Sequence, residues 1–223
     1  MRVIFARLLI ISRVDLFKIL WLAVALFVFD GNMTVEFVKA TQGIFFKDSL
    51  MFLGRNIAKG YKNGIFVDVG AHNGISINNT LYFEKYNNWT GINVEPIKKV
   101  YDCLVSNRPN SININCAVCN NDGETDFLCN EGYTEMLSGI KNNFDPRHIK
   151  RIERENNIKG SVTTTITVPT KKLETIFYDN HIERVNYLSI DVEGAEFEVI
   201  KSINFDKVFI DVIEFENNYD DVS

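Results

Sequence analysis

The sequence predicts an α/β fold built around a parallel β-sheet, and two observations carry the prediction. Short apolar runs rich in β-branched residues recur along the chain and alternate with helix-like segments, as is typical of strands covered on both faces. The first such run, Ile65–Val69, leads into a glycine-spaced loop and then into a helix-like segment. This order predicts a strand that delivers a ligand loop to the carboxyl edge of a parallel sheet.

The loop after this strand has the spacing Gly-x-x-x-Gly, with Gly70 and Gly74 at its ends. Glycine allows positive φ and lets the backbone approach a ligand without an intervening Cβ. The spacing differs from the Gly-x-Gly-x-x-Gly of dinucleotide-binding loops, and Asp68 would place a negative charge beside a pyrophosphate. A ligand with a cationic group, such as S-adenosylmethionine, suits this loop better. The other interpretation is a plain strand-to-helix turn.

The following elements are expected to alternate, with a polar loop at 131–144 that would cover the sheet edge as a lid or substrate-binding segment. In the helix after that loop, Asp145 is the expected N-cap and Pro146 the first residue. Thr170 is the expected cap of the next one. Strands are expected at 65–69, 89–96, 111–118, 124–128, 162–168 (at a sheet edge), 185–190 and 207–216. Helices are expected at 76–85, 96–107, 147–156, 170–178 and 197–201.

An acid ends the second strand, at Glu95, 25 residues beyond Gly70. An acid at this place in a strand–loop–helix–strand unit can accept hydrogen bonds from ribose hydroxyls. A strand-end surface carboxylate is the alternative. Ala117, on the third strand, would lie near the edge where an adenine could pack.

A second acidic segment, Asp-Val-Glu-Gly-Ala-Glu at 191–196, follows the strand at 185–190. If the strand continued, Asp191 and Glu193 would point to the same side and repel each other, so that one of them would hold a proton more readily. Such a group could take a proton from a hydroxyl or amine during methyl transfer. The alternatives are orienting the substrate, stabilising a sulfonium charge, or binding a divalent metal. Glu196 is better explained as a helix N-terminus acid.

Composition and charge narrow the classes of partner. The chain of 223 residues is 46% hydrophobic and 24% charged, with a net charge of −5, which fits one globular domain and disfavours a nucleic-acid surface. Cys116 and Cys119 lack the second pair that a zinc site needs and are expected to be reduced. Among the histidines, His72 would touch a ligand through its backbone, whereas His148 and His181 are expected on the surface.

The first 30 residues differ from the rest, and residues 31–223 are expected to form the folded domain. Basic residues dominate the start, and an uninterrupted run of eleven apolar residues follows at 19–29, shorter than the roughly 20 that span a bilayer. This pattern favours a signal-anchor or membrane-surface helix, and hence membrane association, over a soluble extension packed on the domain. One or two helices are expected at 33–60.

Together these segments resemble the FkbM family of S-adenosylmethionine-dependent methyltransferases over roughly residues 42–218. The resemblance rests on 66–76, Glu95-Pro96, 120–123, 135–140, 187–196 and 211–218, of which the Asp-x-Glu-Gly-x-Glu segment is the most particular. It implies a Rossmann-like class I methyltransferase sheet in three layers and methyl transfer to a hydroxyl of a sugar or small molecule. By position, the cofactor residues would be Asp68, Gly70, Ala71, His72, Asn73, Gly74, Ser76, Glu95, Pro96 and Ala117, and the catalytic acids Asp191 and Glu193.

One departure from the family pattern concerns the C-terminal elements. The family continues past the fifth strand with a helix and a closing hairpin, which are not found after the strand at 207–216, so that the edge beside this strand is expected to be exposed or paired otherwise. A non-catalytic binding or scaffold protein that kept the cleft is therefore the alternative function. A nicotinamide-dependent oxidoreductase is the third hypothesis, which the glycine spacing and Asp68 disfavour.

Overall fold

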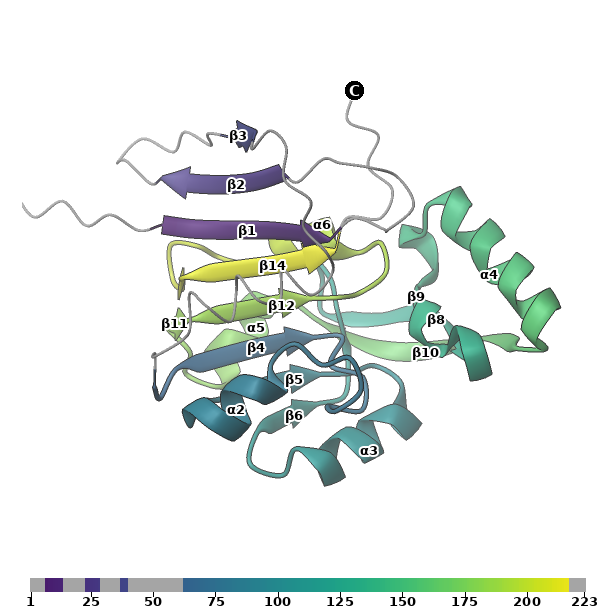
Figure 1. Cartoon of the computed structure of the whole chain (residues 1–223), viewed down its shortest axis with the longest axis horizontal. Coiled ribbons are helices and arrows are strands. Elements are labelled where there is room, and N and C mark those ends of the chain that lie inside the picture. The colour runs from purple at the N-terminus through teal and green to yellow at the C-terminus, as the bar shows by residue number, and fades with distance from the viewer. Residues whose placement is uncertain (1–6, 14–22, 29–36, 40–61, 217–223) are drawn as a thin grey trace, which may run out of the picture.

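The computed structural model of the chain describes residues 7–13, 23–28, 37–39 and 62–216. In this part of the chain, eight strands form one main sheet in the order β3-β2-β1-β14-β12-β4-β5-β6 (Figure 1). Its members are β1 (Arg7–Arg13), β2 (Ala23–Val28), β3 (Phe37–Lys39), β4 (Ile65–Val69), β5 (Thr90–Val94), β6 (Ile112–Ile114), β12 (Tyr187–Ile190) and β14 (Val212–Glu216).

The strands β14, β12, β4, β5 and β6 are parallel to one another, which confirms the parallel sheet. From β4 the chain moves outward to β5 and β6 on one side, and then returns to β12 and β14 on the other. The order therefore reverses between β4 and β12. In an open parallel sheet, the crevice at the carboxyl ends of the two strands beside such a reversal is where ligands bind.

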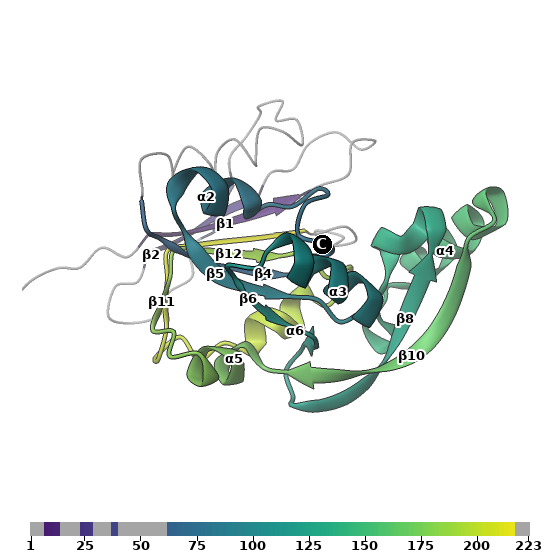
Figure 2. The ribbon, with the colours of Figure 1, turned by 90° about the horizontal axis from the view of Figure 1, so that it is seen from below.

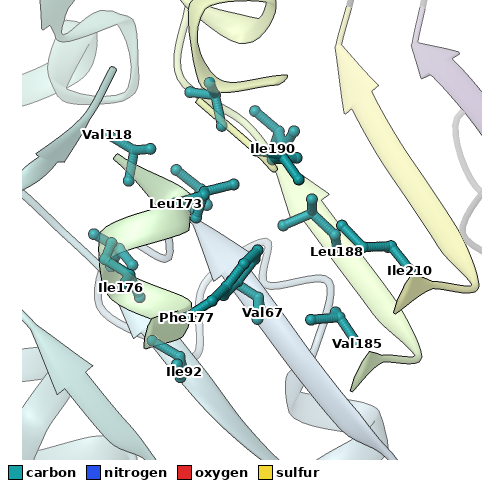
Figure 3. Packing of buried hydrophobic residues seen from close by; sticks show 14 of the residues in the cluster. Val67, Ile92, Val118, Leu173, Ile176, Phe177, Val185, Leu188, Ile190 and Ile210 are labelled. Atoms are coloured by element: carbon teal, nitrogen blue, oxygen red, sulfur yellow. The ribbon is translucent and has the colours of Figure 1, made fainter. Parts of the chain in front are cut away.

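Helices cover both faces of this sheet, as the apolar strands predict. Phe66 and Tyr187 face α2 (Leu81–Asn87), where they pack with Phe83. The alternate residues, among them Val67 and Leu188, face α5 (Leu173–Asp179) and α6 (Glu196–Lys201) in the main core (Figure 3). In Figure 2, α2 lies on one side of the strands and α5 and α6 on the other. The helix α3 (Lys98–Asn107) follows β5, and its C-cap Arg108 contacts the segment before α2.

A second, four-stranded sheet lies beside the carboxyl ends of the main strands (Figure 1). Its order is β7-β10-β8-β9, from β7 (Ala117–Val118), β10 (Val162–Lys171), β8 (Gly123–Glu131) and β9 (Gly139–Ile140). The long antiparallel pair of β8 and β10 carries α4 (Pro146–Lys159) at its far end (Figure 2). Two 3-10 turns, η1 (Gly132–Leu137) and η2 (Lys141–Asn143), flank β9 in the segment expected as a polar loop. A small pair, β11 (Arg184–Val185) and β13 (Phe209–Ile210), completes the strands of the described chain.

The strands expected at 185–190 and 207–216 are each divided in two, into β11 with β12 and into β13 with β14. Three further differences from the expected elements have local causes. The helix expected at 76–85 begins only at Leu81, because the Asn78 side chain accepts hydrogen bonds from the backbone N–H groups of Thr80 and Leu81. The strand expected at 111–118 divides into β6 and β7. Between them the Asn115 side chain donates to the carbonyls of Glu95 and Pro96, at 2.8 and 3.0 Å.

The third difference is Thr170, expected as a helix cap, which lies in β10 and pairs with Gly123 and Ala117. The first N–H groups of α5 are bonded instead by Ser202, whose Oγ accepts from Leu173 N at 3.0 Å. β10 itself was expected at an edge, and this was wrong, since it lies between β7 and β8. By contrast, Asp145 is the N-cap of α4 as expected and accepts a hydrogen bond from the Arg147 N–H.

The N-terminal segment contributes strands where a helix was expected. β1 pairs in parallel with β14, and β2 and β3 continue the sheet as antiparallel strands. The edge of β14 is therefore paired, and its neighbour comes from the start of the chain. Most of the helical region expected at 33–60 lies outside the described residues, and the part within them, 37–39, is β3. No helix in the described part of the chain is both long and apolar enough to cross a membrane.

Candidate functional site

A cleft opens at the reversal of strand order, between the carboxyl ends of the main strands and the second sheet. It holds about 650 Å³ of space, counting the open solvent at its mouth. Three connections meet in it: the loop after β4, the turn after β5 and the turn after β12. The lining residues are Val69, Gly70, His72, Val94, Glu95, Pro96, Ile97, Cys116, Ala117, Val118, Phe127, Glu135, Met136, Ser138, Ile140, Asp191, Val192 and Glu193.

Gly70 is where the loop after β4 turns across the sheet edge. Its φ is +84°, and a Cβ built on it would lie 1.9 Å from the Asp191 carbonyl oxygen, so that only glycine fits. The backbone N–H groups of Gly70 and Ala71 both donate to the Val94 carbonyl, at 3.0 and 3.1 Å. On the other side, Asp191 N–H donates to the Val69 carbonyl at 2.9 Å. These bonds fix the loop to both neighbouring strands and place Gly70 in the cleft.

Gly74, which was expected at the ligand, packs against the end of α3. It is buried with φ +76°, and a Cβ there would lie 2.6 Å from Arg108 Cγ and 2.7 Å from Leu104 Cδ1. The glycine therefore allows α3 to pack against the loop. Asn73 and Ser76 stabilise the same turn, since Asn73 Oδ1 accepts from the N–H groups of Ile75 and Ser76. Neither Asn73, Gly74, Ser76 nor the buried Ala71 lines the cleft.

Asp68 lies beneath the loop rather than in the cleft. Its carboxylate accepts hydrogen bonds from Thr80 Oγ1 at 2.8 Å and from Asn78 Nδ2 at 2.9 Å. Burial raises the pKa of Asp68 to about 6, against these hydrogen bonds and the nearby Arg108. The structure thus shows Asp68 bonded to the segment that follows the loop, and Asp68 does not line the cleft.

Glu95 ends β5 inside the cleft, only 5% exposed. Its two oxygens accept hydrogen bonds from His72 N–H at 3.1 Å and from Ile97 N–H at 2.8 Å. Each carboxylate oxygen has two lone pairs, so that both retain capacity for a further donor. Pro96 lines the cleft beside it, and Ala117 lies in the apolar part of the lining with Phe127.

Asp191 and Glu193 both line the cleft, although the strand ends before them at Ile190. Glu193 reaches it through a turn: its φ is +54° and that of Gly194 is +108°. A Cβ at Gly194 would lie 3.2 Å from the Asn143 carbonyl oxygen, so that η2 packs directly against this turn. The two carboxylates are therefore brought together by a left-handed turn, and strand alternation was the wrong reason for their common direction.

A polar contact joins the loop after β4 to η1 across the cleft. His72, with φ +49°, places Nε2 3.2 Å from Glu135 Oε1 on η1. Its Nδ1 is buried and has no hydrogen-bond partner in the described part of the chain. A ligand in the cleft could satisfy this nitrogen.

A comparison with models of protein families assigns the chain to a family. The model of the methyltransferase FkbM domain matches residues 68–222, which is more than half of the chain. The chain belongs to the FkbM methyltransferase family. A search of curated proteins and a search of solved structures gave no match.

The cleft of this FkbM methyltransferase suits a ligand that carries positive charge. Among the described residues that line it, four are carboxylates, namely Glu95, Glu135, Asp191 and Glu193, and none is Lys or Arg. A sulfonium or ammonium group would be attracted there, whereas a phosphate would be repelled. No group of three His, Cys, Asp or Glu in the described chain could hold a metal ion. The four cysteines are free, and burial raises the pKa of the Cys116 thiol to about 12.

The burial of two residues of this family member, His148 and Arg108, was not predicted from the sequence. His148 was expected on the surface, yet it is fully buried on α4, with Nε2 3.2 Å from the Leu137 carbonyl and Nδ1 3.7 Å from Glu193 Oε2. Arg108 is also fully buried, behind the glycine loop. The polar helix 146–159 hid His148, because a single histidine among many charged and amide side chains gives no periodic signal. His181 is exposed, as expected.

The burial of Glu95 predicts a pH dependence of stability. Burial raises the pKa of Glu95 to about 7, outweighing the hydrogen bonds from Ile97 and His72. The unfolded chain loses this proton near its ordinary pKa of 4.5 and the folded chain near 7, so folding takes up a proton between these values. Stability from this group is therefore present at low pH and is lost as pH rises through about 7, by about 3 kcal/mol in all.

We expect Glu95→Gln to remove most of this pH dependence. Urea unfolding of the ligand-free protein at about pH 5 and about pH 8 measures it. Asp68 acts in the same direction with its pKa of about 6, so a smaller slope should persist in the variant. A variant whose stability falls with pH as steeply as that of the parent would contradict the prediction.

Proposed function

We propose that this chain is an S-adenosylmethionine-dependent O-methyltransferase that acts on a hydroxyl of a sugar or small molecule. The observation that carries the proposal is the convergence of Gly70, Glu95 and the Asp191–Glu193 pair on one cleft at the reversal of strand order. Residues from three separate strand ends meet there, and the charge of the lining suits a cationic methyl donor.

The lining offers a place for each part of such a cofactor. Glu95 would accept hydrogen bonds from ribose hydroxyls, and the apolar residues around Ala117 and Phe127 would pack against the adenine. The His72 Nδ1 atom, which has no hydrogen-bond partner in the described part of the chain, could bond a polar group of the cofactor at the glycine loop. When bound, S-adenosylmethionine supplies an electrophilic methyl group on a positively charged sulfur.

The residues of the cleft would then accept the proton that the acceptor hydroxyl loses. A hydroxyl oxygen that gains a methyl group must lose its hydrogen, and a carboxylate within reach can accept it. Glu193 is the base in this proposal, and Asp191 orients the acceptor and offsets the positive charge. The absence of Lys and Arg from the described lining favours a neutral acceptor over a phosphorylated or carboxylated one.

Calorimetry with S-adenosylhomocysteine tests the cofactor assignment. We expect saturable binding by the parent protein and binding weakened by about tenfold or more in Glu95→Ala, since two ribose hydrogen bonds are lost at about 1 kcal/mol or more each. The absence of binding by the parent would sink the proposal, and so would equal binding by Glu95→Ala. Binding without methyl transfer to any of a panel of neutral glycans and metabolites would favour a scaffold function.

A further inference from the structure

The buried His148 lies directly behind the carboxylate of Glu193. It comes from α4 of the second sheet, whereas Glu193 comes from the turn after β12 of the main sheet. The two meet with His148 Nδ1 3.7 Å from Glu193 Oε2, and the side chain of Glu193, a residue that lines the cleft, is 12% exposed. The imidazole is held from both sides, because it stacks on the Phe144 ring at 4.6 Å and its Nε2 lies 3.2 Å from the Leu137 carbonyl.

The Leu137 carbonyl fixes which nitrogen carries the hydrogen. A carbonyl oxygen can only accept, so Nε2 must donate to it. A neutral imidazole has a single N–H, and Nδ1 therefore presents a lone pair to Glu193. Burial lowers the pKa of His148, which favours this neutral form at neutral pH.

A nitrogen lone pair and a carboxylate oxygen can bond to each other only through a proton between them. One additional proton between Nδ1 and Oε2 converts the pair into a donor and an acceptor. A hydrogen bond that forms only with the protonated carboxyl makes that carboxyl a better proton acceptor. The geometry thus prepares Glu193 to receive a proton from the cleft.

We propose that His148 is a positioning residue that stabilises a proton on Glu193, and this inference rests on the proposed function. The O–H bond of the acceptor breaks and its electron pair stays on that oxygen, which bonds to the methyl carbon as the methyl–sulfur bond of the donor breaks and leaves a neutral thioether. The proton forms a new O–H bond on Glu193. The protonated Glu193 then donates to His148 Nδ1. Product release returns the proton to solvent and restores the resting pair.

Other charged groups near His148 also affect its protonation, and the test must separate their effect from that of Glu193. Asp145 and Glu155 on α4 favour its protonated form, and Arg151 on the same helix disfavours it. On the facing turn, the Glu193 carboxylate lies within 4 Å of the imidazole. A substitution of Glu193 therefore changes its effect on the protonation of His148 and leaves the charges on α4 as they are.

Nuclear magnetic resonance of the ligand-free protein tests the pair directly. In ¹H–¹⁵N spectra of the imidazole, we expect the Nε2–H tautomer at neutral pH. We also expect Nδ1 protonation to shift to lower pH in Glu193→Gln, because the facing negative charge is gone. The Nδ1–H tautomer, or an Nδ1 midpoint that Glu193→Gln leaves unchanged, would overturn the inference. This readout needs neither cofactor nor turnover, so it separates failure of the inference from failure of the proposed function.

Kinetics of His148→Gln provide the second arm, with His181→Gln as the matched control on an exposed histidine. Glutamine can keep the donor to Leu137 but lacks a nitrogen lone pair at the Nδ1 position. We expect the midpoint of the rising limb of kcat against pH to move down by about one unit, a tenfold loss of proton affinity, with KM and S-adenosylhomocysteine affinity unchanged. A variant that is merely less stable but keeps the pH midpoint would show a structural role only and would refute the inference.

Discussion

Glu193→Gln is expected to lower kcat by roughly 10²- to 10⁴-fold, the range for loss of a positioned general base. The variant keeps the size of the side chain, and the turn at φ +54° is equally unfavourable for Glu and Gln, so the cleft should keep its shape. S-adenosylhomocysteine affinity should therefore change little, since the proposed ribose contacts are made by Glu95 at the end of β5, which β4 separates from β12. Single-turnover methylation with the best neutral acceptor measures the chemical step apart from binding.

Glu153→Gln is the matched control for this prediction, because Glu153 is an exposed carboxylate on α4 that does not line the cleft. Its kcat should stay within about twofold of the parent, since surface substitutions of this kind perturb the fold by less than about 0.5 kcal/mol. If Glu193→Gln turned over acceptor at a comparable rate, the base would have to be sought elsewhere, with Asp191→Asn as the next variant to measure.

The residues at the strand ends could be predicted from the sequence because a parallel sheet has only one carboxyl edge. Once Ile65–Val69, the strand before Glu95 and the strand before Asp191 are recognised, their ends must converge. Gly70 could be assigned because the Gly-x-x-x-Gly spacing places it directly after the strand Ile65–Val69. The convergence depends on apolar runs and their order, which the sequence shows directly.

The strand order of the second sheet, and the residues that this sheet brings to the cleft, could not be predicted in the same way. The position of β10 between β7 and β8 depends on a register that pairs residues up to 53 positions apart, such as Thr170 with Ala117 on β7, and no local pattern encodes it. His148 reaches Glu193 only because this sheet carries α4 against the turn after β12. The surroundings of Gly74 and Asp68 could not be predicted for a related reason, since Gly74 packs against α3 and Asp68 bonds the segment before α2, and neither lines the cleft.

Arg108→Met is expected to lower the free energy of unfolding by about 3 to 5 kcal/mol, the range for breaking a buried ion pair from one side. The guanidinium is fully buried and lies 2.7 Å from Glu84 Oε2. It also donates to the Gly74 carbonyl at 3.2 Å and to Asn78 Oδ1 at 3.1 Å, beside the Phe66 ring. Methionine fills a similar volume but would leave the Glu84 carboxylate largely buried, without its cationic partner, and bonded to Ser111 Oγ.

The same substitution should weaken cofactor binding, because Arg108 is one of the residues that hold the glycine loop in a costly conformation, through the Gly74 carbonyl. Gly70, His72, Gly74 and Ile77 all have positive φ, and each of the two that are not glycine costs roughly 1 kcal/mol. Arg154→Met, at an exposed arginine 3.9 Å from Glu155, is the control and should cost less than about 1 kcal/mol. The double variant Arg108→Met with Glu84→Gln should recover part of the stability, since the carboxylate is no longer left alone. Urea unfolding of the three variants tests this account, and a loss for Arg108→Met no larger than that for Arg154→Met would show that the buried arginine does not support the loop.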